Sequence, residues 1–213
     1  MKKFDLIILG GGAAAEHGAE TGMVNEGLPL GGTCVNVGCV PTKHLLEVGN
    51  HYYSANHSRF KAIRTDGSSI DFGAAIAEKD ELIAGLRQQN YRDVLGSMAT
   101  VTLYEGRGRF ISPRKVEVDG QVLTGERFII ATGSSPQIVP FKGIEQVDYL
   151  TNREALVLKT LPKSLIIIGA GPVGMEFAQL FAHFGTEVTV LARGPRVLRR
   201  EEPEVSEELQ RCL

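Results

Sequence analysis

Two cysteines that frame a short, glycine-containing segment are the residues most able to do chemistry in this chain. They lie in the segment 31–43, GGTCVNVGCVPTK, where Cys34 and Cys39 are five positions apart and Gly38 precedes the second. Two thiols at this spacing can approach within the few ångströms that a disulfide requires, and glycine tolerates the backbone angles of a sharp turn. The segment therefore predicts a loop whose dithiol opens and closes as a redox pair.

The residues after the second cysteine have the apolar spacing of a helix over residues 41–53, and Pro41 suits its first turn. This helix would place Cys39 at its N-terminus, where unpaired N–H groups and the helix dipole stabilise a thiolate. Lys43, four residues on, adds a cation on the same face. Cys39 is therefore predicted to act as the thiolate of the pair, with Lys43 in support.

Two other uses of these cysteines stay open. A structural zinc site needs four ligands at paired spacing, but the third cysteine, Cys212, stands near the end of the sequence. An inert structural disulfide is typical of secreted proteins, and nothing in the sequence marks this one as secreted. A redox role is the interpretation that we favour.

The composition excludes several classes of protein. The 213 residues are 43% hydrophobic and 23% charged with a net charge of −2, which indicates neither disorder nor nucleic-acid binding. The apolar run after Asp5 is shorter than the core of a signal peptide, and no stretch approaches the length of a membrane span. We expect a globular, cytoplasmic protein without nucleic-acid or membrane partners.

The first candidate cofactor site follows an apolar, β-rich run at residues 4–9. This run leads into a G-x-G-x-x-A turn, and such a strand, turn and helix place backbone N–H groups around a pyrophosphate. A second strand is predicted over residues 21–25, followed by an acidic residue placed to bind a ribose hydroxyl. The candidate cofactor-binding residues are Gly10, Gly12, Ala15 and Glu26.

The crossover within this first unit is short. Residues 10–20 separate the two strands, which is near the lower limit of about 10–12 residues for a whole crossover. From Gly10 to Glu26 the distance is 26 − 10 = 16 positions, where about 20 are expected. The helix can have two turns at most, so we expect an incomplete first βαβ with a weakened cofactor site.

The middle of the chain predicts one long helix and then a group of strands. The helix covers residues 72–95, and its charged face, which includes Lys79, is expected to lie in solvent. The strands are predicted over residues 99–104, 108–111, 115–118, 121–123 and 127–131. Small residues at the carboxyl end of the last strand would let a ligand approach the backbone, or would form a plain tight turn; they are Ala131, Thr132 and Gly133.

A second glycine motif has the same order of strand, glycine turn, helix and strand, and its crossover is not shortened. The strand 165–168 leads into a G-x-G-x-x-G turn, a helix over 172–184 that Gly185 ends, and a strand over 187–191. Its candidate cofactor-binding residues are Gly169, Gly171 and Gly174. Proline and glycine residues at 136–163 indicate a crossover between two domains, predicted over 1–150 and 151–213.

The residues after the second strand of this motif indicate which nicotinamide cofactor is used. Where an NAD site places an acidic residue, the chain has Ala192 and then Arg193, with further arginines at 196, 199 and 200. Guanidinium groups favour a 2′-phosphate, so NADPH is predicted. The alternative is a solvated basic run that neighbouring glutamates, Glu201, Glu202 and Glu204, neutralise.

Four segments, taken together, resemble the flavin-dependent pyridine nucleotide-disulfide oxidoreductases, the family of dihydrolipoamide dehydrogenase, glutathione reductase and mercuric reductase. They are LIILGGGAAA, GGTCVNVGCVPTK, IIATGSSP and IIGAGPVGMEFAQLF, in this order and over essentially the whole chain. The sequence CVNVGCVPTK and the dipeptide Ala192-Arg193 are most similar to those of the mercuric reductases.

The resemblance implies a fold and a set of cofactors. The fold would be α/β: an FAD-binding Rossmann-like domain with a small antiparallel β insertion, followed by the first βαβ of an NADP-binding Rossmann-like domain. FAD and NADPH would be the cofactors, with electrons passing from NADPH through the flavin to the Cys34–Cys39 disulfide. Cys39 and Lys43 would lie near the flavin, Cys34 would meet the substrate, and the remaining cofactor contacts would be Gly32, Thr33 and Glu176.

The resemblance also implies Hg(II) as the substrate, held as a metal by Cys34 and Cys39, because soft thiolates suit this ion. A small organic disulfide and a non-catalytic nucleotide-binding remnant are the alternatives. Family members continue beyond the position of Leu213 through the rest of the NADP domain to a dimer domain. We therefore expect an N-terminal portion with impaired activity, and a homodimer for the full-length family.

Overall fold

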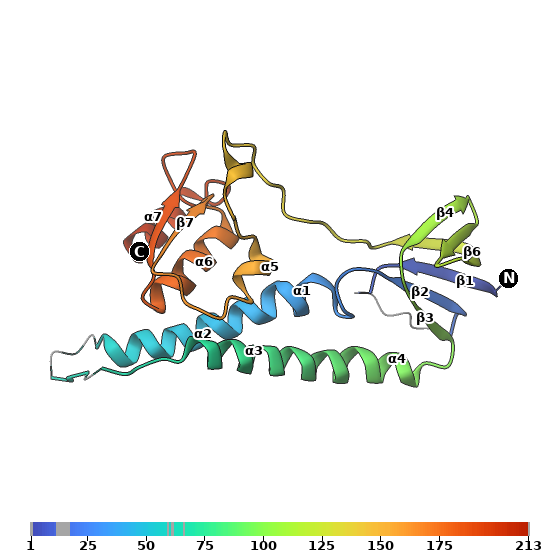
Figure 1. Ribbon diagram of the computed structural model, residues 1–213, viewed down its shortest axis with the longest axis horizontal. Helices are drawn as coiled ribbons and strands as arrows, with labels where there is room; N and C mark the ends of the chain where they lie inside the picture. Colours follow the sequence, from blue (N-terminus) through green and yellow to red (C-terminus); the bar gives the residue numbers. More distant parts are fainter. Residues whose placement is uncertain (1, 12–17, 59, 61, 66, 213) are drawn as a thin grey trace. The chain divides into compact units, whose positions relative to one another are not determined.

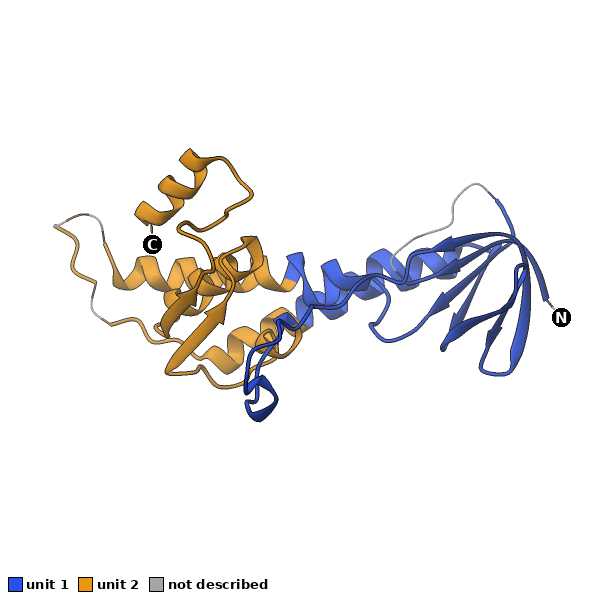
Figure 2. Cartoon of the chain, turned by 90° about the horizontal axis from the view of Figure 1, so that it is seen from above, with its two compact units in different colours: residues 1–40, 81–152 blue, residues 41–80, 153–213 orange. Residues whose placement is uncertain are grey.

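The computed structural model describes residues 2–11, 18–58, 60, 62–65 and 67–212. Contacts divide the chain into two compact units, which Figure 2 colours separately. Unit 1 comprises residues 1–40 and 81–152, and unit 2 comprises residues 41–80 and 153–213. The units alternate along the chain, whereas the domains predicted over 1–150 and 151–213 follow one another and stay a prediction.

Unit 1 contains a six-stranded sheet in the order β3-β2-β1-β6-β5-β4 (Figure 1). The strands are β1 Lys2–Leu9, β2 Thr21–Asn25, β3 Val101–Glu105, β4 Gly108–Ser112, β5 Lys115–Val118 and β6 Gln121–Ile130. β3, β2, β1 and β6 run parallel, while β4, β5 and β6 are joined by antiparallel pairing. The α/β fold with a parallel sheet and a small antiparallel insertion is thus confirmed.

The core of unit 1 explains why the central strands are so apolar. β1 is paired on both edges, and its side chains at Ile7, Ile8 and Leu9 are all buried. Strands that are covered on both faces have continuous apolar runs, not an alternating pattern. Its core cluster joins β1, β2, β5 and β6 through Phe4, Ile7, Leu9, Val24, Val116, Val118 and Leu123.

Two strands predicted separately, at 121–123 and 127–131, form the single strand β6, which ends at Ile130. Residues 124–126 lie between the two predicted strands, but β6 pairs with β1 from Leu123 to Ile130 and with β5 in its first half. Gly125 fits this crowded position, since a Cβ there would lie 3.0 Å from the Ile7 side chain. Pairing on both edges therefore outweighs the local polarity.

The helices of the first half follow the predicted spacing with two changes. They are α1 Gly32–Val37, α2 Cys39–Asn56, α3 Phe72–Arg87 and α4 Asp93–Ser97, and a π-helical turn, η1 Gln88–Arg92, connects the last two. The helix predicted over 72–95 is therefore present but carries a π-helical turn, and the prediction did not include the short helix α1. Within the described ranges, no helix combines the length and the apolar character needed to cross a bilayer.

Unit 2 contains a βαβ segment built as predicted. β7 Ser164–Ile168 and β8 Glu187–Leu191 pair in parallel, and α6 Pro172–His183 connects them. Gly185 follows α6 with a φ of 94°, the left-handed conformation that favours glycine after a helix. The remaining elements of the chain are η2 Ile144–Gln146, α5 Asn152–Ala155 and α7 Pro203–Cys212.

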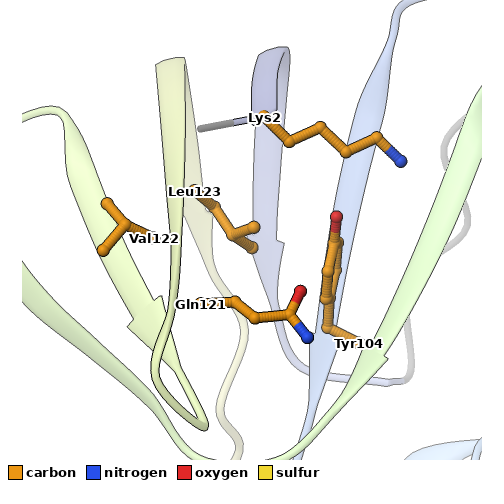
Figure 3. Close-up of a pocket in the computed structure, with 5 residues that line it drawn as sticks. All are labelled: Lys2, Tyr104, Gln121, Val122 and Leu123. Atoms are coloured by element: carbon orange, nitrogen blue, oxygen red, sulfur yellow. The ribbon is translucent and has the colours of Figure 1, made fainter.

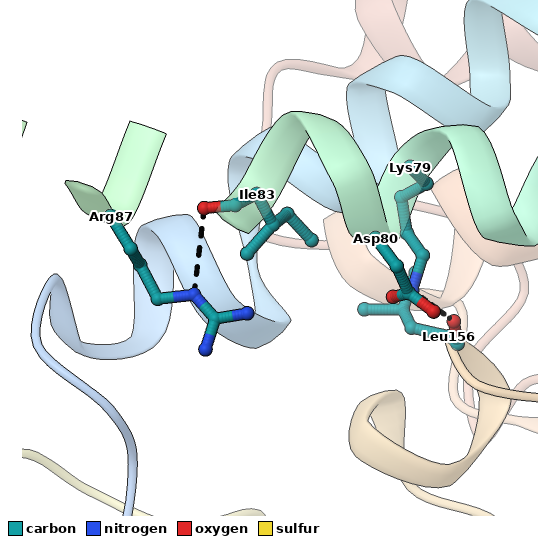
Figure 4. A network of polar contacts seen from close by, with 5 residues as sticks. All are labelled: Lys79, Asp80, Ile83, Arg87 and Leu156. Carbon is teal, nitrogen blue, oxygen red and sulfur yellow. Dashed lines mark hydrogen bonds and ion pairs between the residues drawn. The ribbon is translucent and has the colours of Figure 1, made fainter. Parts of the chain in front are cut away.

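The core of unit 2 contains one charged residue that was expected in solvent. Its apolar members come from α2, α3, α5, α6 and the residues directly after the last two helices, and they are Leu45, Leu46, Phe72, Ala75, Ile76, Ala155, Leu156, Phe177, Leu180, Phe181 and Phe184. Lys79 on α3 is only 2% exposed, so its predicted solvent position is wrong. Figure 4 shows its side chain with Asp80 and Leu156, whose carboxylate and backbone carbonyl accept hydrogen bonds from Nζ at 2.5 and 2.9 Å.

Candidate functional site

The two cysteines of the motif stand at the junction of two helices. Cys34 lies on α1, and Cys39 is the first residue of α2, as its predicted place at a helix N-terminus requires. The segment between them was expected to be a loop, but residues 34–37 are helical and Gly38 alone separates the helices. Both thiols are free and exposed.

Gly38 is needed for close approach and not for a left-handed conformation. Its φ is −128°, which other residues can adopt. A Cβ at this position would lie 2.8 Å from the Thr33 carbonyl oxygen and 3.2 Å from Cα of Cys34. Glycine therefore lets the start of α2 lie directly against the helix turn that carries the first cysteine.

The electrostatics of the pair distinguish the two thiols. A hydrogen bond between the Cys34 and Cys39 side chains raises the pKa of the Cys34 thiol, and burial raises that pKa further. Cys34 therefore loses its proton at a higher pH than an ordinary cysteine does. The predicted division of roles, in which Cys39 is the thiolate, stays a prediction.

Asparagine side chains hold the segment around the cysteines. Nδ2 of Asn36 lies 2.9, 3.3 and 2.8 Å from the carbonyl oxygens of Pro29, Leu30 and Gly32. Nδ2 of Asn152 donates to the Val37 carbonyl at 2.6 Å. Sequence reasoning missed both residues: an amide between two cysteines could have been a signal for Asn36, but Asn152 is 115 positions from its partner.

The carboxyl ends of three parallel strands gather the first set of predicted cofactor residues. Gly10 follows β1 and donates to Val24 of β2 at 2.7 Å, while Ala131 donates to Leu9 at 2.8 Å. Gly10 has a φ of 134°, and a Cβ there would lie 2.1 Å from the Ala131 carbonyl oxygen. The first glycine of the motif therefore meets the residue that ends β6.

The other residues of this first set are placed as follows. Thr132 and Gly133 are exposed beyond β6, and there is open space around Gly133. Glu26 is exposed directly after β2, and Gly32 and Thr33 open α1. Gly12 and Ala15 lie outside the described residues. The surroundings described here fit a dinucleotide, because the strand ends leave backbone and small residues accessible to it.

The second glycine turn, in unit 2, has the three spatial features of a dinucleotide fingerprint. Gly169 has a φ of 114° and forms the tight turn after β7. Gly171 has nothing within 4 Å of where its Cβ would be, which leaves room for a pyrophosphate. At Gly174 a Cβ would lie 2.0 Å from the Gly169 carbonyl oxygen, so glycine is required for α6 to pack on the strand.

The basic loop after β8 is anchored to this turn. The backbone N–H of Leu198 donates to the Ala170 carbonyl at 2.8 Å. Arg193 is exposed, and in the described part of the chain no ion pair joins the arginines of residues 193–200 to Glu201, Glu202 or Glu204. Their charge therefore stays available to an anionic group.

Lys43 and Glu176, predicted from two different motifs, meet in unit 2. The ammonium of Lys43, on α2, forms an ion pair with the carboxylate of Glu176, on α6. Both side chains remain partly exposed. The structure thus brings together two residues that are 133 positions apart in the sequence.

A hollow of about 450 Å³ lies elsewhere in unit 1, at the amino ends of β1 and β6 (Figure 3). Its lining includes Lys2, whose ammonium already donates to the Thr102 hydroxyl at 2.9 Å and lies 6.0 Å from the Tyr104 ring centroid. It contains none of the predicted site residues. Across the described residues, no cluster of three or more histidine, cysteine or acidic side chains could hold a metal.

Comparisons with known proteins agree with this arrangement of motifs. The family model of the pyridine nucleotide-disulphide oxidoreductases matches residues 4–213. Mercuric reductase of Lysinibacillus sphaericus is 41% identical over 99% of this chain and 40% of its own length. Mitochondrial dihydrolipoyl dehydrogenase of Pisum sativum is 33% identical over 98% of this chain and 44% of its own length.

A solved structure gives the same result. The Cu(II) complex of the HOCl-induced flavoprotein disulfide reductase RclA from Escherichia coli superposes with a TM-score of 0.85 at 29% identity, over 100% of this chain and 47% of that one. The chain thus spans less than half the length of these relatives. The match of the family model to almost every residue shows that the chain belongs to the pyridine nucleotide-disulphide oxidoreductases.

Proposed function

We propose that the chain carries the redox pair of a flavin-dependent oxidoreductase that uses NADPH to reduce Hg(II). The observation that carries the proposal is the pair of exposed free thiols, Cys34 and Cys39, at a two-helix junction in a chain 41% identical to a mercuric reductase. Thiolates are soft ligands, and soft metal ions prefer them.

FAD, when bound, supplies a two-electron carrier between the nicotinamide and the disulfide. Its proposed ligands in unit 1 are the residues at the carboxyl ends of β1, β2 and β6, together with the start of α1. They are Gly10, Gly12, Ala15, Glu26, Gly32, Thr33, Ala131, Thr132 and Gly133. Lys43, in unit 2, is proposed as a further cofactor-binding residue on the resemblance to the family, and its ammonium forms an ion pair with Glu176.

The cysteines take part in a balanced cycle. One NADPH and one proton from solvent reduce the Cys34–Cys39 disulfide to two thiols, and NADP⁺ leaves. Binding of Hg(II) by both sulfurs releases the two protons and forms two sulfur–metal bonds. A second NADPH supplies the two electrons that convert Hg(II) to Hg(0), both sulfur–metal bonds break and NADP⁺ leaves. The two sulfurs take up protons again, one from NADPH and one from solvent. Cys34 is proposed to meet the incoming substrate, as the resemblance to the family implies.

NADPH is proposed to bind in unit 2, with its pyrophosphate at Gly169, Gly171 and Gly174 and its 2′-phosphate at Arg193. Two observations support this position. Space is open beside Gly171, and the basic loop is tied to the glycine turn through Leu198. Glu176, on the helix that starts at this turn, is proposed to bind the nicotinamide end.

A pair of glycine variants tests the cofactor proposal by thermal shift, because a ligand that binds the folded chain raises its melting temperature. Gly171→Ala adds a methyl group to open space, so we expect an unchanged melting temperature without ligand and loss of the NADPH-induced shift. Gly174→Ala is the contrast, since its Cβ would meet a backbone oxygen and lower the melting temperature by itself. A wild-type chain that NADPH does not stabilise would refute this site.

The metal is tested by equilibrium titration of the reduced chain with Hg(II) in competition with a thiol buffer. We expect one tightly bound ion, with at least hundredfold weaker binding in Cys34→Ser and in Cys39→Ser, because one thiolate is then lost. Cys212→Ser is the matched control and should bind as the wild type does. Equal binding by all three variants would contradict the assignment.

A second candidate substrate is a small organic disulfide, favoured by the 33% identity to a dihydrolipoyl dehydrogenase. In this reaction the thiolate of Cys34 attacks one substrate sulfur, and the Cys39 thiolate then displaces the substrate thiol, which restores the disulfide. Mixing the reduced chain with lipoamide or oxidised glutathione and counting the remaining thiols separates this candidate from Hg(II). Oxidation at millisecond to second rates would favour the organic disulfide, whereas a slow reaction would favour the metal.

A further inference from the structure

The helix that carries Cys34 has few means of holding its own position. α1 has six residues, and a helix of this length is unstable without tertiary contacts. Val35 is its one buried residue, and its N-cap, Gly31, offers no side-chain hydrogen bond. Whatever fixes α1 therefore also fixes the sulfur of Cys34 relative to that of Cys39.

The amide of Asn36 fixes the first end of α1. Its Nδ2 carries two hydrogens, and the two shortest contacts are to the carbonyl oxygens of Gly32, at 2.8 Å, and Pro29, at 2.9 Å. Gly32 belongs to α1, whereas Pro29 belongs to the segment before it. One side chain therefore ties the helix to the segment that leads into it, at a position between the two cysteines.

The amide of Asn152 fixes the other end. The last carbonyl groups of a helix have no partner within the helix, and the carbonyl of Val37, the final residue of α1, accepts from Asn152 Nδ2 at 2.6 Å. The next residue is Gly38, which packs against the Thr33 carbonyl oxygen. This contact therefore acts at the point where the chain turns from Cys34 to Cys39.

We infer that Asn36 and Asn152 are positioning residues that hold Cys34 opposite Cys39 in the dithiol state and so favour closure of the disulfide. The inference rests on the proposed redox role of the pair. A tethered thiol reacts with its neighbour at a high effective concentration, and ordering a loosened helix costs conformational entropy when the bond closes. Loss of either amide should therefore make the disulfide less stable relative to the dithiol.

The experiment equilibrates the 213-residue chain with mixtures of reduced and oxidised glutathione. One glutathione disulfide breaks, the Cys34–Cys39 bond forms, and the two cysteine protons end on two glutathione thiols. Acid quenching, alkylation and mass spectrometry then give the fraction of closed pairs. For Asn152→Ala we expect the closure constant to fall about fivefold, since one hydrogen bond contributes roughly 1 kcal/mol. Tenfold is about 30 mV for this two-electron couple.

Two variants separate positioning from general stability. Asn152→Asp keeps the size of the side chain, but its carboxylate has no hydrogen to donate to the Val37 carbonyl, so it should lower the closure constant at least as much as Asn152→Ala does. Asn56→Ala is the matched control, because its amide donates to the Tyr52 carbonyl at 2.9 Å on α2, away from the cysteines. It should leave the closure constant unchanged within twofold.

The outcomes are distinct. A lower closure constant in Asn36→Ala, Asn152→Ala and Asn152→Asp, but not in Asn56→Ala, supports the inference. If Asn36→Ala fails to fold, Asn152→Asp decides. A wild-type constant in the Asn152 variants overturns the inference and leaves the redox role intact. A wild-type chain that never closes the Cys34–Cys39 bond overturns the proposed function itself.

Discussion

Replacement of Lys79 would measure how much a buried ammonium contributes to unit 2. The side chain is 2% exposed and donates to the Leu156 carbonyl and the Asp80 carboxylate. Two variants separate the contribution of its charge from that of its apolar stem. Lys79→Met keeps most of the apolar stem and removes the charge, whereas Lys79→Ala removes both.

The expected magnitudes follow from the groups that each variant removes. Lys79→Ala deletes three methylene groups beyond Cβ, at about 0.8 kcal/mol each. It also takes a donor from the Leu156 carbonyl, which costs about 1–3 kcal/mol. Removal of the ammonium also removes the free-energy cost of burying a charge, and this offsets part of the loss. We expect destabilisation of about 3 kcal/mol for Lys79→Ala and about 1–2 kcal/mol for Lys79→Met.

Urea unfolding followed by far-ultraviolet circular dichroism measures both values. Glu78→Ala is the control, since Glu78 precedes Lys79 on α3 but is exposed, and surface substitutions usually stay within about 0.5 kcal/mol. If Lys79→Ala unfolds at the same urea concentration as Glu78→Ala, the buried ammonium contributes nothing and the reasoning is refuted. If Lys79→Met is as unstable as Lys79→Ala, burial of the lysine methylene groups stabilises unit 2 less than we expect.

Three further predictions concern the thiol junction and one histidine. Gly38→Ala should lower stability by about 2 kcal/mol, because its Cβ would lie 2.8 Å from a backbone oxygen; an unchanged urea midpoint would contradict this. The Cys39→Ala variant removes the hydrogen bond that raises the Cys34 pKa, so the pH midpoint of Cys34 alkylation should move down toward 9.0. An unchanged midpoint would show that this hydrogen bond does not raise the Cys34 pKa. Burial, and then His57, lower the pKa of His183 below 6.5. The folded state then binds fewer protons than the unfolded state, so stability should fall as pH drops below 6.5, and His183→Phe should flatten this slope in urea titrations at pH 5 and pH 7.5.

Elements governed by local pattern could be predicted from the sequence. β2 and β8 lie at the predicted residues 21–25 and 187–191, and α6 differs from its prediction by one residue. Alternating apolar residues, a glycine turn and a glycine after the helix are signals carried within a few positions. The same holds for Cys39 at a helix N-terminus, since Pro41 and the apolar spacing indicate the helix directly.

Features that depend on distant partners could not be predicted in this way. Lys79 is buried because a carbonyl 77 positions away accepts its hydrogen bond, and a helical charge pattern cannot show that. β6 continues through Thr124, Gly125 and Glu126 because β1 and β5 pair with it. The helix α1 was missed since six residues give too little periodicity, and the amide of Asn152 supports it from far along the chain.

The pairing of β1 with β6 has a consequence for how the chain folds during synthesis. Lys2 pairs with Leu123 and Leu9 with Ile130, so the partners are 123 − 2 = 121 residues apart. At about 5–20 residues per second, an apolar central strand waits on the order of 6–24 s for its neighbour to leave the ribosome. Such distant pairing also slows folding after release. β1 is therefore an apolar strand that stays without its β6 partner for seconds during synthesis.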